Sequence, residues 1–220
     1  MKNISIKKII SSTLISFLLI QVLYVFIFEP VISSAASVTD NVIVTLNVTS
    51  GVTISNGSDT TMTPNIGITS DRSIGSSSWS VATNSATGYT LAVKASTTPA
   101  LRNGAVDNFA DYTEATPGTP DVWGGVAVST KEFGYSAYGT DVPTATWGTA
   151  STCGNTGTGV PDVLGKYRGF TTSDVTIASR AGVTPTTGVT SNICFAAQQN
   201  TVYAASGTYT ATITATATAS

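Results

Sequence analysis

The chain has 220 residues, with 10 Lys and Arg, 12 Asp and Glu, no His and a net charge of −2. The missing histidines exclude Ser-His-Asp and Cys-His nucleophiles, His-ligated zinc and an imidazole proton shuttle. The few basic residues argue against a nucleic-acid partner, because phosphate binding needs a basic face. Threonine, serine, alanine and glycine are abundant, which favours strands and turns over helices with charged faces.

The N-terminus has the layout of a secretory signal. Three lysines precede the apolar residues 9–28, and small residues follow them. Ser34 and Ala36 supply the small side chains that a signal peptidase requires, so we expect cleavage between Ala36 and Ser37. An uncleaved anchor is the alternative, because the apolar stretch approaches the about 20 residues that span a bilayer.

Cleavage divides the chain into a signal peptide, residues 1–36, and a mature part, residues 37–220. The signal carries three basic residues and one acidic residue, so the mature part has a net charge near −4. Its length suits one all-β domain, since such domains reach about 200 residues. We expect this domain to act outside the cell or at the cell surface.

The first predicted strand lies close behind the cleavage site. Val42, Val44, Leu46 and Val48 alternate with other residues, which gives a strand with one apolar face. We expect this strand to complete its own sheet. In the alternative it completes the sheet of a neighbouring copy, because backbone pairing is indifferent to which chain supplies the strand. Such strand exchange would join copies head to tail.

Later stretches alternate in the same way. Residues 77–83 and 89–93 predict a hairpin across the turn residues 84–88. Residues 103–125, rich in Asp, Pro, Gly and Thr, predict a long loop with little regular structure. Further strands are expected at residues 51–55, 126–138, 175–179, 193–197 and 207–218. Many strands separated by turns predict an all-β fold, an antiparallel β-sandwich, with a barrel as the alternative.

The cysteine pair, Cys153 and Cys194, lies in the part that we expect to be exported. Oxidising compartments favour disulfides, and no histidine is present to share a metal with the thiolates. We therefore predict a structural disulfide between them, with two free thiols as the alternative. The bond would close a loop of about 40 residues and stabilise the fold by about 3 to 4 kcal/mol.

Catalysis without histidine would have to use carboxylates, of which residues 103–125 contain Asp107, Asp111, Glu114 and Asp121. A glycosidase needs two carboxylates across a sugar, and a calcium ion needs several oxygen ligands on a loop. The spacing of these four residues matches neither pattern. We therefore predict that the chain is not an enzyme and has no metal site and no cofactor.

Aromatic residues gather between positions 123 and 147. Phe133 and Tyr135 share one face of a predicted strand, which indicates core positions. Trp123 and Trp147 stand among Gly, Pro and Thr, and we predict them as the candidates for ligand contact, because planar rings stack on sugars and anchor interfaces.

Three short segments carry a family resemblance: S-S-W-S-V at residues 77–81, G-Y-T-L at 88–91 and G-T-Y-T-A-T-I at 207–213. The chain resembles secreted bacterial β-sandwich proteins of the WxL cell-wall type and fimbrial, spore-coat-like subunits. It lacks their second Trp-x-Leu. The resemblance implies a structural or adhesive subunit whose partners are other surface proteins, the cell wall or glycans. The alternative function is an extracellular glycan-binding module.

Overall fold

The computed structural model describes residues 6–28, 41–55 and 57–220, which fall into two units, residues 1–47 and residues 48–220. The first unit contains helix α1 (Ile6–Phe28), which covers the predicted apolar stretch. Within the described residues, no helix combines the length and the apolar character that crossing a membrane requires. The expected cleavage site between Ala36 and Ser37 lies outside the described residues.

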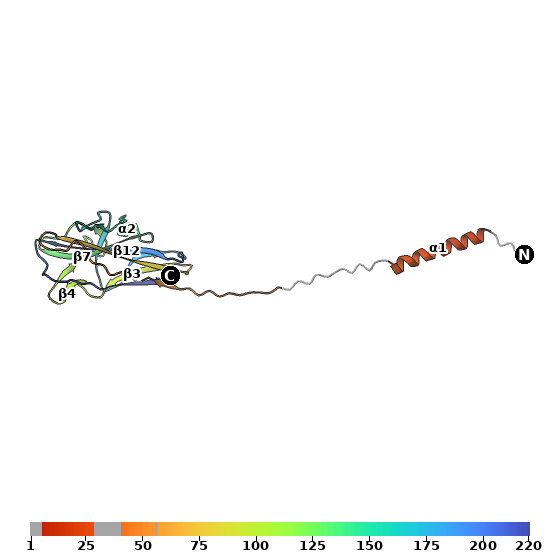
Figure 1. Ribbon diagram of the computed structural model, residues 1–220, viewed down its shortest axis with the longest axis horizontal. Coiled ribbons are helices and arrows are strands. Elements are labelled where there is room, and N and C mark those ends of the chain that lie inside the picture. The colour runs from red at the N-terminus through yellow and green to blue at the C-terminus, as the bar shows by residue number, and fades with distance from the viewer. Residues whose placement is uncertain (1–5, 29–40, 56) are drawn as a thin grey trace. The chain divides into compact units, whose positions relative to one another are not determined.

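The second unit is built from β-strands, as the composition predicts (Figure 1). Its large sheet carries β5 (Asp107–Asp111) as a parallel neighbour of β7, and β5 pairs in turn with β4 (Leu101–Asn103). The other pairings of this sheet are antiparallel, in the order β1 (Val52–Ile54), β2 (Arg72–Thr83), β12 (Val189–Asn200), β7 (Thr130–Gly139), β10 (Lys166–Gly169) and β6 (Asp121–Val122).

The smaller sheet has the order β11 (Val175–Arg180), β3 (Tyr89–Ala95) and β13 (Ile213–Ala219), all antiparallel. Its last strand, β13, is an edge of this sheet. Two small elements complete the described part of the unit, a strand pair of β8 (Gly154–Asn155) with β9 (Val160–Pro161) and the one-turn helix α2 (Thr144–Trp147).

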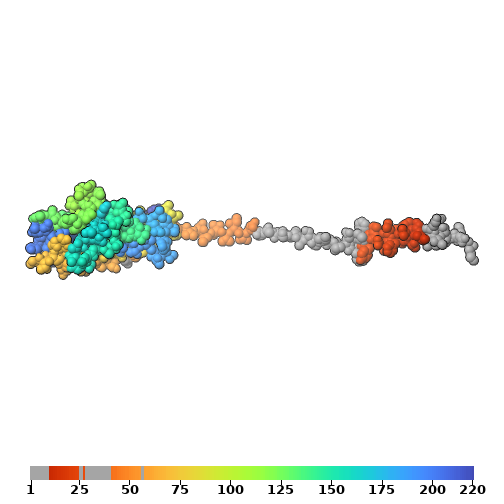
Figure 2. Space-filling model, turned by 90° about the horizontal axis from the view of Figure 1, so that it is seen from above, coloured from red at the N-terminus to blue at the C-terminus, as the bar shows by residue number. Residues whose placement is uncertain are grey.

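The main core lies where the inward faces of both sheets meet. Its aromatic members include Trp79 from β2, Phe133 and Tyr135 from β7, Tyr89 from β3 and Phe195 from β12. These side chains are buried because the alternation of each strand directs every second residue to this side. Figure 2 shows the strands of this unit gathered in one closely packed body.

A second, smaller core includes the predicted disulfide. Cys194 of β12 is bonded to Cys153, which lies in the loop before β8, and their Cα atoms are 5.1 Å apart. Ile74, Tyr167 and Ala196 pack beside the bond. The disulfide prediction is therefore confirmed, and the bond fixes the loop around Cys153 to the large sheet.

The predicted hairpin of residues 77–83 and 89–93 is wrong. Both strands exist, but β2 belongs to the large sheet and β3 to the small one. Gly88 explains the change of sheet, because its φ of +92° suits glycine and a Cβ atom there would lie 1.8 Å from the carbonyl oxygen of Arg180. The turn between the strands therefore crosses from one sheet to the other.

Two further expectations need correction. Residues 42–48 form no strand, and Val42 and Leu46 are 82% and 83% exposed. A strand needs a partner for its backbone groups, and no sheet edge pairs with these residues. Residues 103–125 are also more regular than predicted, because they contain β5 and β6, which pair with neighbouring strands of the large sheet.

Candidate functional site

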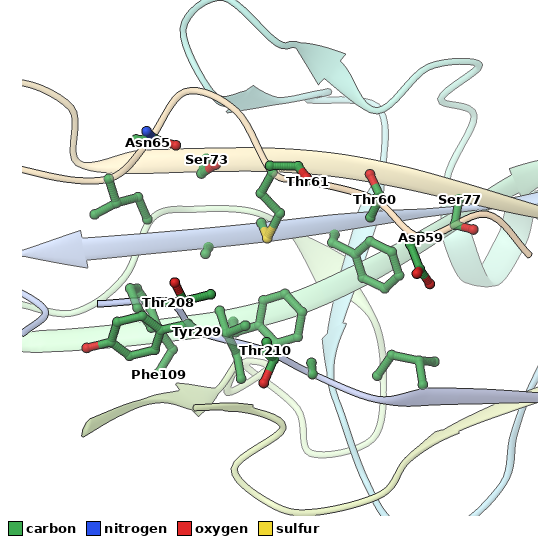
Figure 3. A pocket seen from close by; sticks show the side chains of 18 of the residues that line it. Asp59, Thr60, Thr61, Asn65, Ser73, Ser77, Phe109, Thr208, Tyr209 and Thr210 are labelled. Carbon is green, nitrogen blue, oxygen red and sulfur yellow. The ribbon is translucent and has the colours of Figure 1, made fainter. Parts of the chain in front are cut away.

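A large groove of about 1410 Å³ opens between the two sheets on the side of β2 and β13. In Figure 3, Ser73 and Ser77 of β2 lie along one wall, and Tyr209 and its neighbours, which precede β13, lie along the other. The segment between β1 and β2, including Asp59, also lines the groove. Pockets for small molecules have about 300 to 1,000 Å³, so this groove is large enough for more than a small ligand.

Small side chains keep the groove open. Ser73, Ser77, Ala197 and Ala215 line it at positions where their strands direct side chains toward the main core. A buried sheet face filled by larger residues would close this space, because protein interiors pack at the density of organic crystals. Ser73 is 4% exposed, and its hydroxyl has no hydrogen-bond partner among the described residues.

The groove runs along an unpaired strand edge. The carbonyl of Thr212 accepts a bond from Ser96, and the amide of Ser220 donates to Gly88, so even-numbered residues of this segment pair with β3. Backbone groups alternate in direction along a strand, so those of Ile213 and Ala215 point away from β3. Within residues 209–215, Thr210 also exchanges two backbone bonds with Arg102 of β4. The backbone groups of this wall that no described strand uses are therefore those of odd-numbered residues such as Ile213 and Ala215.

Asp107, at the start of β5, fixes the segment that precedes this wall. One of its oxygens accepts bonds from the hydroxyl of Tyr209 at 2.5 Å and from the amide of Ala205 at 2.8 Å. The other oxygen receives the ammonium group of Lys131 and the amide of Asn108. The carboxylate therefore connects β5, β7 and residues 205–209 at one point.

This arrangement changes the acidity of both groups. The hydrogen bonds from Lys131 and then Tyr209 hold the pKa of Asp107 well below its ordinary value. Burial, followed by the hydrogen bond to Asp107, raises the pKa of Tyr209 to about 12. At neutral pH the pair is thus a carboxylate and a neutral phenol, which suits a structural clasp and offers no proton-transfer group near neutral pH.

The other three carboxylates are also held by structural bonds. Asp111 accepts from the amide of Ala100, and burial raises its pKa. Glu114 accepts from the amide of Gly169, and Asp121 accepts from the hydroxyl of Tyr112 at 2.7 Å. The described residues contain no group of three or more acidic, histidine or cysteine side chains that could hold a metal ion.

The two candidate tryptophans do not line the groove. Trp147 is 1% exposed and packs against Tyr135 in the main core, so the prediction that it contacts a ligand is wrong. Trp123 is half-buried, stacks on Tyr112 at 4.5 Å and donates from Nε1 to Gln198. The Gly, Pro and Thr residues around these tryptophans suggested surface positions, but strands distant in the sequence cover the two rings.

Sequence reasoning missed most of the groove. The alternation of residues 207–218 predicted a strand, of which the structure forms β13 from Ile213 onward, and the apolar face that it identified is the side that faces the core. The opposite wall comes from β2 and from the residues before it, 54, 55 and 57–68, whose Ser- and Thr-rich sequence resembles any exposed loop.

Comparison of this chain with protein-family models, curated proteins and solved structures finds no match. Any functional conclusion therefore rests on the chain itself. The arrangement combines a groove lined by both polar and apolar side chains, a free strand edge and carboxylates committed to structural bonds. It suits binding of an extended chain segment better than bond-breaking chemistry.

Proposed function

We propose that this chain is a non-catalytic protein of the bacterial cell surface, exported by its N-terminal signal, folded as a β-sandwich and acting as a structural or adhesive subunit. The observation that carries the proposal is the groove along the unpaired edge of residues 209–215. Surface subunits work by pairing with other chains, and an open sheet edge is the element through which β-proteins do so.

Three further features support the proposal. Both sheets contribute to one core, as the layers of a sandwich do. A disulfide between Cys153 and Cys194 suits an oxidising compartment. The carboxylates that a histidine-free hydrolase would need, among them Asp107 and Asp121, are held by neighbouring donors. The resemblance to WxL-type and fimbrial proteins agrees with the same function.

A cell-fractionation experiment tests the proposal. We expect the full-length gene, expressed in a bacterium, to yield a product in the cell-wall or medium fraction whose mass corresponds to a chain beginning at Ser37. The same product should leave a panel of polysaccharides unchanged. A cytoplasmic product with an intact N-terminus would overturn the export, and polysaccharide cleavage that disappears with Asp121→Asn would overturn the non-catalytic function.

Glycan binding is the second candidate, and one feature favours it. Tyr203 lines the groove and is 65% exposed, so its ring face is available for stacking on a sugar. A panel of neutral polysaccharides tests it, and Tyr203→Ala should abolish any binding. Val183→Ala, another exposed position away from the groove lining, is the matched control.

A further inference from the structure

We infer that the groove binds residues 42–48 of a second copy of this chain, which lie along residues 209–215 as an added strand. The inference rests on the proposed function and names the partner of the subunit. Five features of the described residues lead to it: the pattern of the segment, its length, the free edge, the unpartnered hydroxyl in the groove and the place where the segment is anchored.

Residues 42–48 have the composition of a strand that has no sheet. Val42, Val44, Leu46 and Val48 are 74% to 88% exposed, although each is a residue that water disfavours. Their alternation would place all four on one face when the segment is extended. The segment contains no charged residue, so it can enter the groove without burying an unpaired charge.

The groove fits such a strand in length and in chemistry. Residues 209–215, of which 213–215 belong to β13, are as many as residues 42–48, so the two segments can lie side by side without overhang. The backbone groups of Ile213 and Ala215 point toward the place where the added strand would lie. The apolar face of the strand would cover Phe133 and Phe195 at the bottom of the groove.

The hydroxyl of Ser73 is a second, independent sign of an occupant. The residue is 4% exposed, it lines the groove and its Oγ atom has no hydrogen-bond partner among the described residues. Buried hydroxyls in folded proteins are nearly always paired. A strand lying along the groove brings backbone amides and carbonyls, with which the hydroxyl of Ser73 can form hydrogen bonds.

The anchoring of the segment favours a second copy over its own groove. The side chain of Asn84 accepts from the amide of Gly51 at 2.7 Å and donates to the carbonyl of Thr49 at 2.9 Å. This anchor lies near the C-terminal end of β13, where the amide of Ser220 donates to Gly88. The groove lies along the N-terminal end of β13 and the residues before it. From this anchor β1 runs toward the groove, which Ile54 and Ser55 line, so residues before the anchor could enter the same groove only after a reversal of the chain. A segment from another copy needs no such turn.

The contact joins the segment of one copy to the groove of another, which are different parts of the chain, so it is heterologous. Head-to-tail contacts of this kind continue into open filaments unless the rotation between copies closes a ring. The expected product is therefore a ladder of oligomers that grows with concentration.

Two substitutions on opposite faces of the segment test the inference. Leu46→Asp would place a carboxylate on the face that covers Phe133 and Phe195, and we expect it to raise the concentration for half-assembly at least about 100-fold. Thr45→Asp adds the same charge on the opposite face and should change it little. Both positions are exposed in the single chain, so the melting temperature of the disulfide-bonded domain should stay the same in both variants.

Cross-linking locates the contact. Thr45 and Thr212 are the central residues of the two segments, so they lie opposite one another whichever way the added strand runs. Mixing full chains that carry Thr45→Cys with chains that carry Thr212→Cys should give a disulfide-linked heterodimer. Thr45→Cys mixed with Thr119→Cys, an exposed site on the loop before β6, should not.

Three outcomes would overturn the inference: a ladder that survives Leu46→Asp, equal losses with both aspartates, or a chain that stays monomeric at every concentration. A link that forms only within a single chain carrying both cysteines would assign the groove to the chain's own segment. A monomer located at the cell surface would overturn this inference and leave the proposed function standing. A cytoplasmic chain that still forms the ladder would support this inference and overturn the proposed function.

Discussion

The ionised Asp107, which binds Lys131 and Tyr209, should stabilise the fold beside the groove. Asp107→Asn keeps the shape of the side chain and one acceptor oxygen but removes its charge. The Lys131 and Asp107 side chains are 15% and 20% exposed, so water screens their attraction less than that of a surface pair. Hydrogen bonds to charged groups contribute about 1.5 to 3 kcal/mol each, and the substitution weakens those from Lys131 and Tyr209. We expect the free energy of unfolding at pH 7 to fall by about 2 to 4 kcal/mol.

The effect should depend on pH in a defined direction. The pKa of Asp107 is lowered in the folded protein, so the ionised form stabilises the fold. That stabilisation is complete above the unfolded carboxyl pKa of about 3.9 and is lost as the pH falls through the folded value. The difference between the wild type and Asp107→Asn should therefore shrink in strong acid. The same variant should lower the pKa of Tyr209 from about 12, because it removes the carboxylate that accepts the phenol's hydrogen bond.

Urea unfolding at several pH values, with an ultraviolet titration of the phenol, measures both effects. The matched control is Asp174→Asn, which removes a 3.6 Å pair with Lys94 whose side chains are 49% and 40% exposed. Exposed pairs contribute about 0 to 1 kcal/mol, so this variant should be close to the wild type. Equal losses of unfolding free energy from the two substitutions would show that the charge of Asp107 does not stabilise the fold. A loss for Asp107→Asn that stays constant from pH 7 into strong acid would show the same.

The other predictions concern stability. Replacing Cys153 and Cys194 together by alanine should lower the free energy of unfolding by about 4 kcal/mol, because the bond spans a sequence separation of 41 residues; a loss near zero in urea unfolding without reductant would contradict this. Gly88→Ala should destabilise far more than Gly104→Ala, since both glycines have positive φ but only Gly88 has backbone 1.8 Å from the added atom, at Arg180. Thermal melts of the two variants measure the difference, and equal melting temperatures would show that the turn adapts.

Period-two patterns predicted the strands well where both sides of a strand are paired. The stretch around Trp79 became β2, and the stretch around Cys194 became β12, each longer than predicted because its neighbours in the sheet extend the pairing. The disulfide was also predictable, since the chain contains no other cysteine. These features depend on local pattern and on counts of residue types, which the sequence contains directly.

Pairing and burial were not predictable in the same way. The pattern of residues 42–48 is as regular as that of β13, yet only β13 has a partner strand. The strands before and after Gly88 match a hairpin in pattern, but the contact of Gly88 with a distant carbonyl places them in different sheets. Trp147 resembled a surface residue because its immediate neighbours in the sequence are small. Its burial comes from Tyr135, which contacts it only in the folded chain.

Hydrogen exchange of the amides in residues 209–219 tests most directly whether this groove and its edge accept an added strand. In the monomer, the amides of Ile213 and Ala215 point away from β3 and should exchange fast, while those of Thr214 and Thr216 are protected. In assembled material, Ile213 and Ala215 should become protected as well. Assembly that leaves these two amides exchanging as fast as in the monomer would contradict this expectation.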